Sequence, residues 1–258
     1  MTVLSTEPAV LLENRDGVTR VTLNRPKYRN ALDKAAIKLL HSRLRDASRE
    51  KDIKVLVIRG AGGSFSAGAD VKAFETDVDP ADPGELIRDY YTPVFTLLRD
   101  LRVPTVASVT GACAGVGMSL ALMCDLVIAS SSAYFVQAFV NIGLVPDMGS
   151  SWMLPRRLGE ARAKALMMLG EQLPATLAAD YGLVYKCVPD ELLEQETDEV
   201  CKRLARGPTQ TYLAIRELTH LAWKNDLPAQ IDDERRLQNI AIGTKFFQSA
   251  VSRFKNKS

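Results

Sequence analysis

Two loops built mainly from glycine and other small residues have the composition of a site where backbone N–H groups bind an anion. The first loop covers residues 60–70 (GAGGSFSAGAD), and the second covers residues 111–117 (GACAGVG). Because glycine has no Cβ atom, both backbones can come close to one ligand. Two N–H groups that converge on one oxygen form an oxyanion hole, which stabilises negative charge as it develops in acyl chemistry. The sequence therefore predicts an oxyanion hole between these loops.

Buried strands are predicted to position the two loops. Apolar runs typical of such strands precede them, at residues 55–58 and 105–109. Further strands are predicted at residues 18–23, which follow an Asp-Gly turn, and at residues 125–129. Repeated units of strand, loop and helix at this spacing predict an α/β core in which most strands run parallel.

Helices are predicted between and after these strands. One is expected near residues 85–100, and another from Asn30, a good N-cap, with an apolar stripe formed by Leu32, Ala36, Leu40, Leu44 and Ala47. Beyond about residue 160 the pattern becomes mostly helical, and one long amphipathic segment covers residues 229–254. We therefore divide the chain into a core domain, residues 1–199, and a helical C-terminal region, residues 200–258.

Composition narrows the class of protein. The chain has 258 residues, 47% of them hydrophobic, and a net charge of +2 that argues against a nucleic-acid-binding protein. The start lacks the pattern of a signal peptide, and no apolar run is long enough to span a bilayer. The four cysteines form no C-x-x-C pair, and no cluster of metal ligands is evident. We expect a cytoplasmic protein with reduced thiols and no metal.

Three motifs carry a resemblance to a known family. Residues 23–26 (LNRP), 30–32 (NAL) and 65–70 (FSAGAD) resemble the enoyl-CoA hydratase/isomerase (crotonase) superfamily, and the similarity extends over nearly the whole chain. The resemblance implies an α/β fold, the coiled ββα superhelix of that family, with a helical C-terminal region for trimer contacts. It also implies an acyl-CoA thioester substrate, no separate cofactor, and a homotrimer or dimer of trimers.

A further segment is most similar to one branch of the superfamily. Residues 135–139 (FVQAF), 143–147 (GLVPD) and 154–156 (LPR) resemble ring-epoxide isomerases of phenylacetyl-CoA breakdown and their enoyl-CoA isomerase relatives. Phe139 and the Pro- and Asp-rich residues 76–84, which we expect to be a mobile loop beside the acyl pocket, favour a cyclic or aromatic acyl group.

The resemblance assigns the oxyanion hole to the backbone N–H groups of Ala69 and Val116. Family members commonly have glycine at position 116, but the donor is the backbone, so valine is compatible if its φ is negative. Lys27 is the preferred partner of the coenzyme A phosphates. The remaining residues expected to bind substrate or coenzyme A are Ala67, Gly68, Ala69, Asp70, Val71, Gly115 and Phe139.

Asp147 is expected to be the acid/base residue. The two positions at which the hydratase branch carries glutamates hold Ser119 and Phe139, so ordinary hydration is disfavoured, and the Ser119 hydroxyl is expected to bind a carbonyl of its own helix. Isomerase relatives place a carboxylate where Asp147 stands, and one carboxylate is enough to move a double bond. We expect apolar surroundings that raise its pKa, formed by Phe139, Leu144, Val145 and Met148.

Several alternatives stay open at this point. Pro-Asp-x-Gly is also a good turn, in which Asp147 would only cap the helix that follows. The protein could be an enoyl-CoA hydratase that holds water with other groups, or a hydrolase similar to 4-chlorobenzoyl-CoA dehalogenases, although His41 and His220 do not match the histidine of those enzymes. A non-catalytic acyl-CoA-binding protein is a further alternative, because both glutamates are absent.

Overall fold

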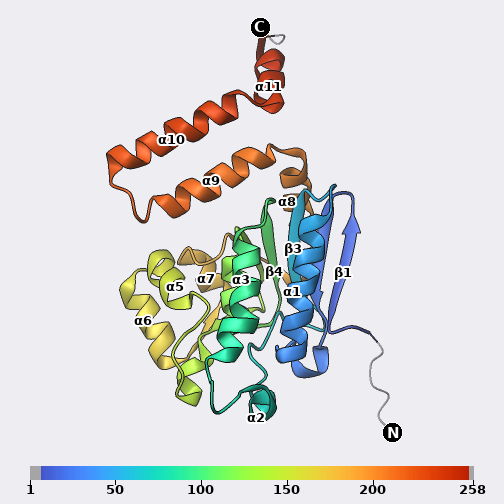
Figure 1. Cartoon of the computed structure of the whole chain (residues 1–258), viewed down its shortest axis with the longest axis vertical. Coiled ribbons are helices and arrows are strands. Elements are labelled where there is room, and N and C mark those ends of the chain that lie inside the picture. Colours follow the sequence, from blue (N-terminus) through green and yellow to red (C-terminus); the bar gives the residue numbers. More distant parts are fainter. Residues whose placement is uncertain (1–6, 256–258) are drawn as a thin grey trace.

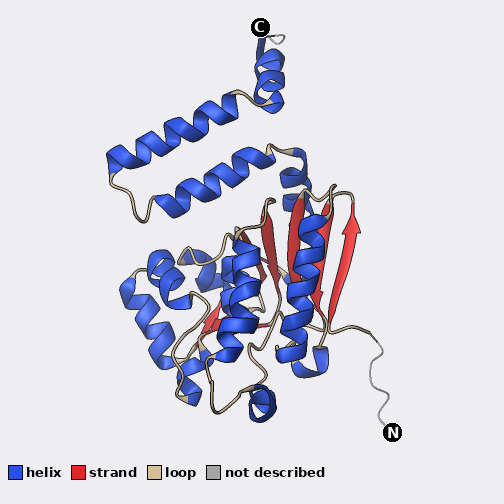
Figure 2. Cartoon of the chain, in the orientation of Figure 1, coloured by secondary structure: helices blue, strands red, loops and turns tan. Residues whose placement is uncertain are grey.

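The main sheet places the two loops at one edge of the molecule. The computed structural model describes residues 7–255, and this sheet has six strands in the order β1-β2-β3-β4-β6-β9. β1 is antiparallel to β2, whereas all the other neighbouring pairs are parallel. The strands are drawn in Figure 2 and are β1 (Val10–Arg15), β2 (Val18–Leu23), β3 (Val55–Gly60), β4 (Thr105–Val109), β6 (Leu126–Ser130) and β9 (Lys186–Val188).

Both faces of this sheet are covered, which explains why its central strands are apolar without alternation. In β3, Leu56 and Ile58 belong to the larger core, whereas Val55 and Val57 pack on the opposite face with Cys201 of the C-terminal region. Helices α1 (Lys34–Arg49) and α3 (Thr92–Arg99) lie along the face that Figure 1 shows in front. The predicted parallel α/β core is therefore confirmed.

A small second sheet holds the loop of residues 111–117. It consists of β5 (Ala112–Ala114), β7 (Tyr134–Val136) and β8 (Gln172–Pro174), with β5 parallel and β8 antiparallel to β7. The helices of the core are α1 (Lys34–Arg49), α2 (Phe74–Asp77), α3 (Thr92–Arg99), α4 (Val116–Met123), α5 (Ser150–Leu158), α6 (Glu160–Leu169) and α7 (Ala175–Asp180). Short 3-10 helices cover Pro26–Tyr28, Val71–Ala73, Ala138–Ile142 and Asp190–Leu192, and a π-helical turn, Leu86–Tyr91, precedes α3.

The predicted start of the first helix was wrong by three residues, since its N-cap is Asp33 and not Asn30. α1 begins at Lys34 because the Asp33 carboxylate caps it, accepting the N–H of Ala36 at 2.7 Å. Asn30 is instead fully buried at φ +56°, and its side chain ties three neighbouring backbone groups together, those of Arg25, Ala61 and Ser64. The predicted apolar stripe is otherwise correct, since Ala36, Leu40, Leu44 and Ala47 are buried.

The C-terminal region is helical, as expected, and comprises α8 (Leu193–Arg206), α9 (Thr209–Leu221), α10 (Leu227–Ile242) and α11 (Lys245–Lys255). The expected boundary between residues 199 and 200 lies inside α8, which packs on the main sheet. Figure 1 shows α9, α10 and α11 beyond the core. The single helix expected over residues 229–254 is two helices, because Thr244 accepts the N–H of Phe247 and starts a new one. Among residues 7–255, no helix is long and apolar enough to cross a membrane.

Candidate active site

The two small-residue loops pair directly with each other. Ser66 donates its N–H to the Ala112 carbonyl and accepts the N–H of Ala114, each at 2.9 Å. This approach depends on Gly68, whose φ is +92° and where a Cβ atom would lie 2.8 Å from the Ala114 carbonyl oxygen. Any larger residue would push the loops apart, which explains the glycine at this position.

Two backbone N–H groups, those of Ala69 and Val116, are left without an acceptor. The loop binds Leu32 on one side through the Gly68 carbonyl and the Asp70 N–H, so the N–H of Ala69 points the other way. Val116 is the first residue of α4, follows Gly115 at φ +50°, and is not among the residues with positive φ. No residue between 7 and 255 accepts either N–H group. The condition on the φ angle of Val116 is therefore met.

Both residues line a cavity of about 390 Å³, called here the apolar cavity. Most of the predicted site residues meet in it, including Gly115, Phe139 and Asp147. Its lining consists of Ala67, Gly68, Ala69, Val71, Phe74, Val78, Pro83, Leu86, Ile87, Tyr91, Gly115, Val116, Ala138, Phe139, Asn141, Ile142, Leu144 and Asp147. The segment 76–84 lies beside this cavity, as predicted, because Val78 and Pro83 form part of its wall.

Two predicted residues do not line the apolar cavity. The Asp70 carboxylate lies 3.1 Å from the Arg25 guanidinium, in an ion pair largely shielded from solvent. Arg25 also binds Asp33 at 2.7 Å, so this pair links the first loop to the start of α1. Lys27 is exposed in the 3-10 helix Pro26–Tyr28.

The Asp147 carboxyl group has the environment of a weakened acid. Its Oδ1 atom is buried and has no hydrogen-bond partner among residues 7–255. Burial raises the pKa of Asp147 from 3.8 to about 6, although its own backbone N–H opposes part of the rise. The alternative that Asp147 caps α5 fails, because that helix has no side-chain cap and the Asp147 carbonyl, not its carboxylate, accepts the Ser150 N–H.

The apolar surroundings of Asp147 differ from the prediction at one residue. Phe139 and Leu144 line the cavity, and Met148 packs against the main core. Val145 is 80% exposed and therefore points away from the site. The turn that follows has positive φ at both Met148 and Gly149.

Tyr91 is a polar residue of the cavity that no sequence motif points to. It is almost completely buried at the end of the π-helical turn, and its hydroxyl donates to the Leu32 carbonyl at 3.0 Å. Burial raises the pKa of Tyr91, and the Asp147 carboxylate raises it further. Tyr91 and Asp147 both line the apolar cavity, and the effect of the Asp147 charge on Tyr91 joins residues 56 positions apart, which no local pattern indicates.

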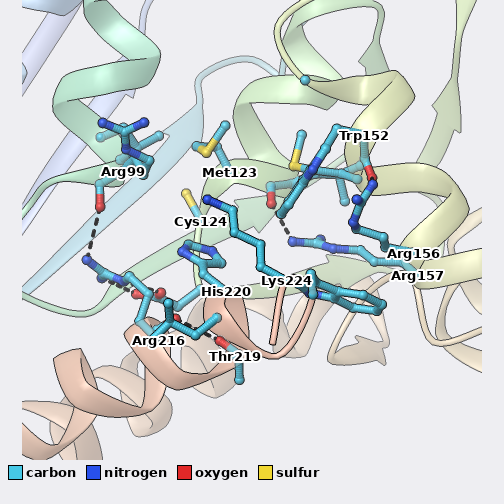
Figure 3. A pocket seen from close by; sticks show the side chains of 17 residues that line it. Arg99, Met123, Cys124, Trp152, Arg156, Arg157, Arg216, Thr219, His220 and Lys224 are labelled. Atoms are coloured by element: carbon cyan, nitrogen blue, oxygen red, sulfur yellow. Dashed lines mark hydrogen bonds and ion pairs between the residues drawn. The ribbon is translucent and has the colours of Figure 1, made fainter. Parts of the chain in front are cut away.

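A second and larger cavity lies between α5 and α9 (Figure 3). Its volume is about 580 Å³, and we call it the basic cavity because its lining includes Arg99, Arg156, Arg157, Arg216, His220 and Lys224. Arg216 binds the Asp125 carboxylate at 2.5 Å and the carbonyls of Leu101 and Val103. Arg157 donates to the carbonyl of Leu122 at 2.6 Å. Arg216 and Arg157 thus donate hydrogen bonds to carbonyl groups near the C-terminal ends of α3 and α4. These bonds connect the two helices to α9 and α5 and stabilise the fold.

Ser119 is fully buried in α4, and its hydroxyl lies 3.3 Å from the Gly115 carbonyl, as expected. All four cysteines are free. Neither histidine lines the apolar cavity: His41 lies on α1, and His220 lines the basic cavity, edge-on to Trp152 at 6.3 Å between ring centroids.

Known proteins resemble this chain over almost its whole length. Residues 13–258 match the enoyl-CoA hydratase/isomerase family. The 1,2-epoxyphenylacetyl-CoA isomerase of Escherichia coli K12 is 36% identical over 95% of this chain and 94% of that protein, and a probable enoyl-CoA hydratase of Rhodobacter capsulatus is 36% identical with the same coverage. The crystal structure of an enoyl-CoA hydratase from Bacillus anthracis has a TM-score of 0.88 and 27% identity, over 97% of each chain. With its two paired loops and its ββα core, this chain is an enzyme of the enoyl-CoA hydratase/isomerase (crotonase) superfamily.

Proposed function

We propose that the protein is an acyl-CoA isomerase that moves a double bond next to a coenzyme A thioester. The observation that carries the proposal is that one unpaired carboxyl group and two unpaired N–H groups line the same apolar cavity. A carboxylate and an oxyanion hole are the two components that proton abstraction next to a thioester requires. Of the two relatives described above, one is called an isomerase and the other a probable hydratase, so their names include both activities of the family.

In the proposed reaction, a 3-enoyl thioester places its carbonyl oxygen against the N–H groups of Ala69 and Val116. Asp147 removes a proton from C2, and the negative charge of the resulting dienolate is stabilised at that oxygen. The protonated Asp147 then returns the proton to C4, which moves the double bond to C2–C3. A carboxyl group with a pKa of about 6 is ionised at neutral pH and is a stronger base than an ordinary aspartate.

Hydration would need a second group to activate and hold water. Ser119 does not line the apolar cavity, and its hydroxyl is engaged by carbonyls and by Ser150. Phe139 presents a ring 3.7 Å from the position of a Cβ atom on Gly115. These two positions therefore offer no carboxylate for water, which favours isomerisation over hydration.

Rearrangement of a ring epoxide is a second candidate. It needs the same oxyanion hole, and a relative with 36% identity is called 1,2-epoxyphenylacetyl-CoA isomerase. The aromatic rings of Phe74 and Phe139 in the wall of the cavity are suited to a cyclic acyl group. A dehalogenase-like route is less well supported, because neither His41 nor His220 lines the cavity.

The remaining features of the proposal concern substrate binding and assembly. We place coenzyme A along the backbone of residues 67–71, with Lys27 near its phosphates, and no further cofactor. We also propose a cytoplasmic homotrimer or dimer of trimers. The exposed apolar side chains of Leu227, Ile231 and Ile240 on α10, each more than half exposed, support assembly through the C-terminal helices.

The test is conversion of a 3-enoyl-CoA, followed by ultraviolet absorbance of the conjugated product and by mass spectrometry. We expect an isomer of unchanged mass, whereas a hydratase product would gain one water. Asp147→Asn should lower kcat by about 10²-fold or more, and the exposed control Asp52→Asn should not. Tight binding of acyl-CoA without turnover of the enoyl or ring-epoxide substrates would instead identify a binding protein.

A further inference from the structure

A chain of buried polar side chains lies directly behind the apolar cavity. Ser119, Ser150 and Gln137 are each 0% exposed. The two serine hydroxyl oxygens are 2.5 Å apart, and the Gln137 Nε2 atom lies 3.3 Å from the Ser150 hydroxyl. The Ser119 hydroxyl also lies 3.3 Å from two carbonyl oxygens, those of Gly115 and Asp147. The chain thus joins α4 to the segment that carries the carboxyl group.

The Gln137 Nε2 atom faces Ser150, and its Oε1 atom is buried without a partner among residues 7–255. With this orientation of the amide, the direction of the hydrogen bonds follows from the two ends of the chain. The Gln137 amide nitrogen can only donate, and the two carbonyl oxygens can only accept. Ser150 therefore accepts from Gln137 and donates its proton to Ser119. Ser119 is then free to donate its own proton to the carbonyls of Gly115 and Asp147, so that every hydroxyl in the chain is satisfied.

The segment around Asp147 has few other attachments. Among residues 7–255, no residue accepts a backbone N–H from Val145, Met148 or Gly149, and the Asp147 N–H reaches only its own side chain. Met148 and Gly149 have φ of +48° and +82°, and a conformation of this kind is costly for methionine. Within residues 7–255, the Asp147 carbonyl accepts hydrogen bonds from two groups, the Ser150 N–H of the same turn and the Ser119 hydroxyl.

We propose that Ser119 is a positioning residue that fixes the Asp147 backbone relative to the oxyanion hole. Its hydroxyl bridges the Asp147 carbonyl and the carbonyl of Gly115, the residue immediately before the Val116 N–H. One side chain thus sets the distance between the acid/base residue and the group that binds the thioester oxygen. This inference rests on the proposed function for its kinetic consequence, but the geometric consequence can be measured independently.

Four variants test this role. Ser119→Ala removes the bridge, and Ser119→Thr keeps the hydroxyl. Ser150→Ala removes the donor behind Ser119 but leaves the Ser119 proton pointing at the carbonyls. Ser130→Ala is the packing control, because Ser130 is an equally buried serine on β6 whose hydroxyl interacts with Ser132 and Asp190, not with the segment that carries Asp147.

Kinetics and the titration of Asp147 are measured on each variant. The carboxyl resonance of Asp147 in a ¹³C-labelled protein is assigned by its absence from Asp147→Asn. For Ser119→Ala we expect kcat to fall by about tenfold or more with KM within about threefold, because a shift of about 1 Å in a catalytic group has effects of this order. The titration midpoint should also fall from about 6 toward about 4 as the carboxyl gains solvent. Ser119→Thr, Ser150→Ala and Ser130→Ala should stay within about threefold of wild type in kcat.

The two proposals fail in different ways. An unchanged Asp147 titration midpoint in Ser119→Ala overturns the positioning role, whatever happens to kcat. Equal losses of kcat in Ser119→Ala and Ser130→Ala overturn it as well, since both then reflect packing alone. If the wild type isomerises no enoyl-CoA, the proposed function fails, and the titration by itself still decides whether Ser119 positions Asp147.

Discussion

The basic cavity and the apolar cavity differ in how their polar groups are satisfied. The basic cavity is larger and more highly charged, but Arg157 and Arg216 bind backbone carbonyls or the Asp125 carboxylate. The apolar cavity has little charge, yet the Asp147 Oδ1 atom and the N–H groups of Ala69 and Val116 have no partner among the described residues. Since buried polar groups are normally paired, three unpaired groups around one cavity are what a bound ligand would satisfy.

Of these two cavities, size and charge favour the basic cavity, whereas unsatisfied hydrogen-bonding capacity favours the apolar cavity, in which we propose the active site. In the basic cavity the cations complete the ends of helices and strands, which stabilises the fold. In the apolar cavity, we propose that hydrogen bonds to a bound substrate offset the free-energy cost of burying these groups without partners. Substitutions in the first region should thus affect stability, and substitutions in the second should affect turnover.

The largest effect is expected for Gly68→Ala in the apolar cavity. The new Cβ atom would lie 2.8 Å from the Ala114 carbonyl oxygen, so the loop must move and carry the Ala69 N–H with it. Loss of one oxyanion donor costs about 2.7–4 kcal/mol of transition-state stabilisation, which corresponds to a fall of about 10²- to 10³-fold in kcat. Steady-state kinetics on the folded variant measure this fall in kcat.

Gly159→Ala is the matched control for this prediction. Gly159 has a positive φ of +76°, but nothing lies within 4 Å of the position of its Cβ atom. The control should lose about 1 kcal/mol of stability and keep kcat within about twofold. If both variants lose kcat equally, backbone strain rather than the oxyanion hole explains the result.

In the basic cavity, Arg216→Ala should lower the free energy of unfolding by about 3 kcal/mol. The side chain is only 14% exposed, and its loss leaves the Asp125 carboxylate and the carbonyls of Leu101 and Val103 with fewer partners. Urea unfolding measures the change. The control is Arg235→Ala, which removes an exposed ion pair within α10. A large loss of kcat in Arg216→Ala at unchanged stability would contradict the comparison.

Asp147→Asn should make the protein more stable at neutral pH while it abolishes turnover. Because the pKa of Asp147 is raised in the folded state, its ionisation opposes folding, and stability is lost as pH rises from about 4 through about 6. One pKa unit is worth about 1.4 kcal/mol, so the gain at pH 7.5 should be about 2 kcal/mol after allowance for partial exposure.

Thermal unfolding at pH 7.5 and at pH 4 checks this sign. The difference between Asp147→Asn and wild type should disappear at the lower pH, where the aspartate is protonated in both folded and unfolded chains. Asp52→Asn, an exposed substitution, should show no such pH-dependent difference. A variant less stable than wild type at pH 7.5 would show that the Asp147 carboxylate has a favourable partner.

The main strands and the two loops could be predicted because their signals are local. Four buried apolar residues in a row, as at residues 55–58, predict a strand covered on both faces, and the structure has β3 there. The start of α1 was misplaced since Asn30 and Asp33 are both good caps, and only tertiary contacts show that the Asn30 amide is used by other loops. A single sequence does not show which of these two residues caps the helix.

The candidate site was predictable at its motifs and not at its long-range contacts. Gly68 and Gly115 are visible from the motifs, because close backbone approach requires glycine at position 68 and φ of +50° favours it at position 115. Tyr91 and the hydroxyl contact between Ser119 and Asp147 depend on helices that meet only after folding. Val145 was assigned to the site because it is apolar, but it is 80% exposed and does not line the cavity.

The smallest effect is expected at Arg156, whose guanidinium lies over Trp152 at 4.3 Å and Trp223 at 5.6 Å from the ring centroids. This guanidinium lies over two tryptophan rings, yet exposed cation–π pairs contribute only about 0.5–1 kcal/mol to the free energy of unfolding. Arg156→Ala should lower stability by that amount and leave kcat and KM within about twofold. Arg162→Ala, which removes a similar contact with Tyr181 at 3.9 Å, is the control. A fall in kcat confined to Arg156→Ala would give the basic cavity a part in turnover, and the contrast between the two cavities would then no longer hold.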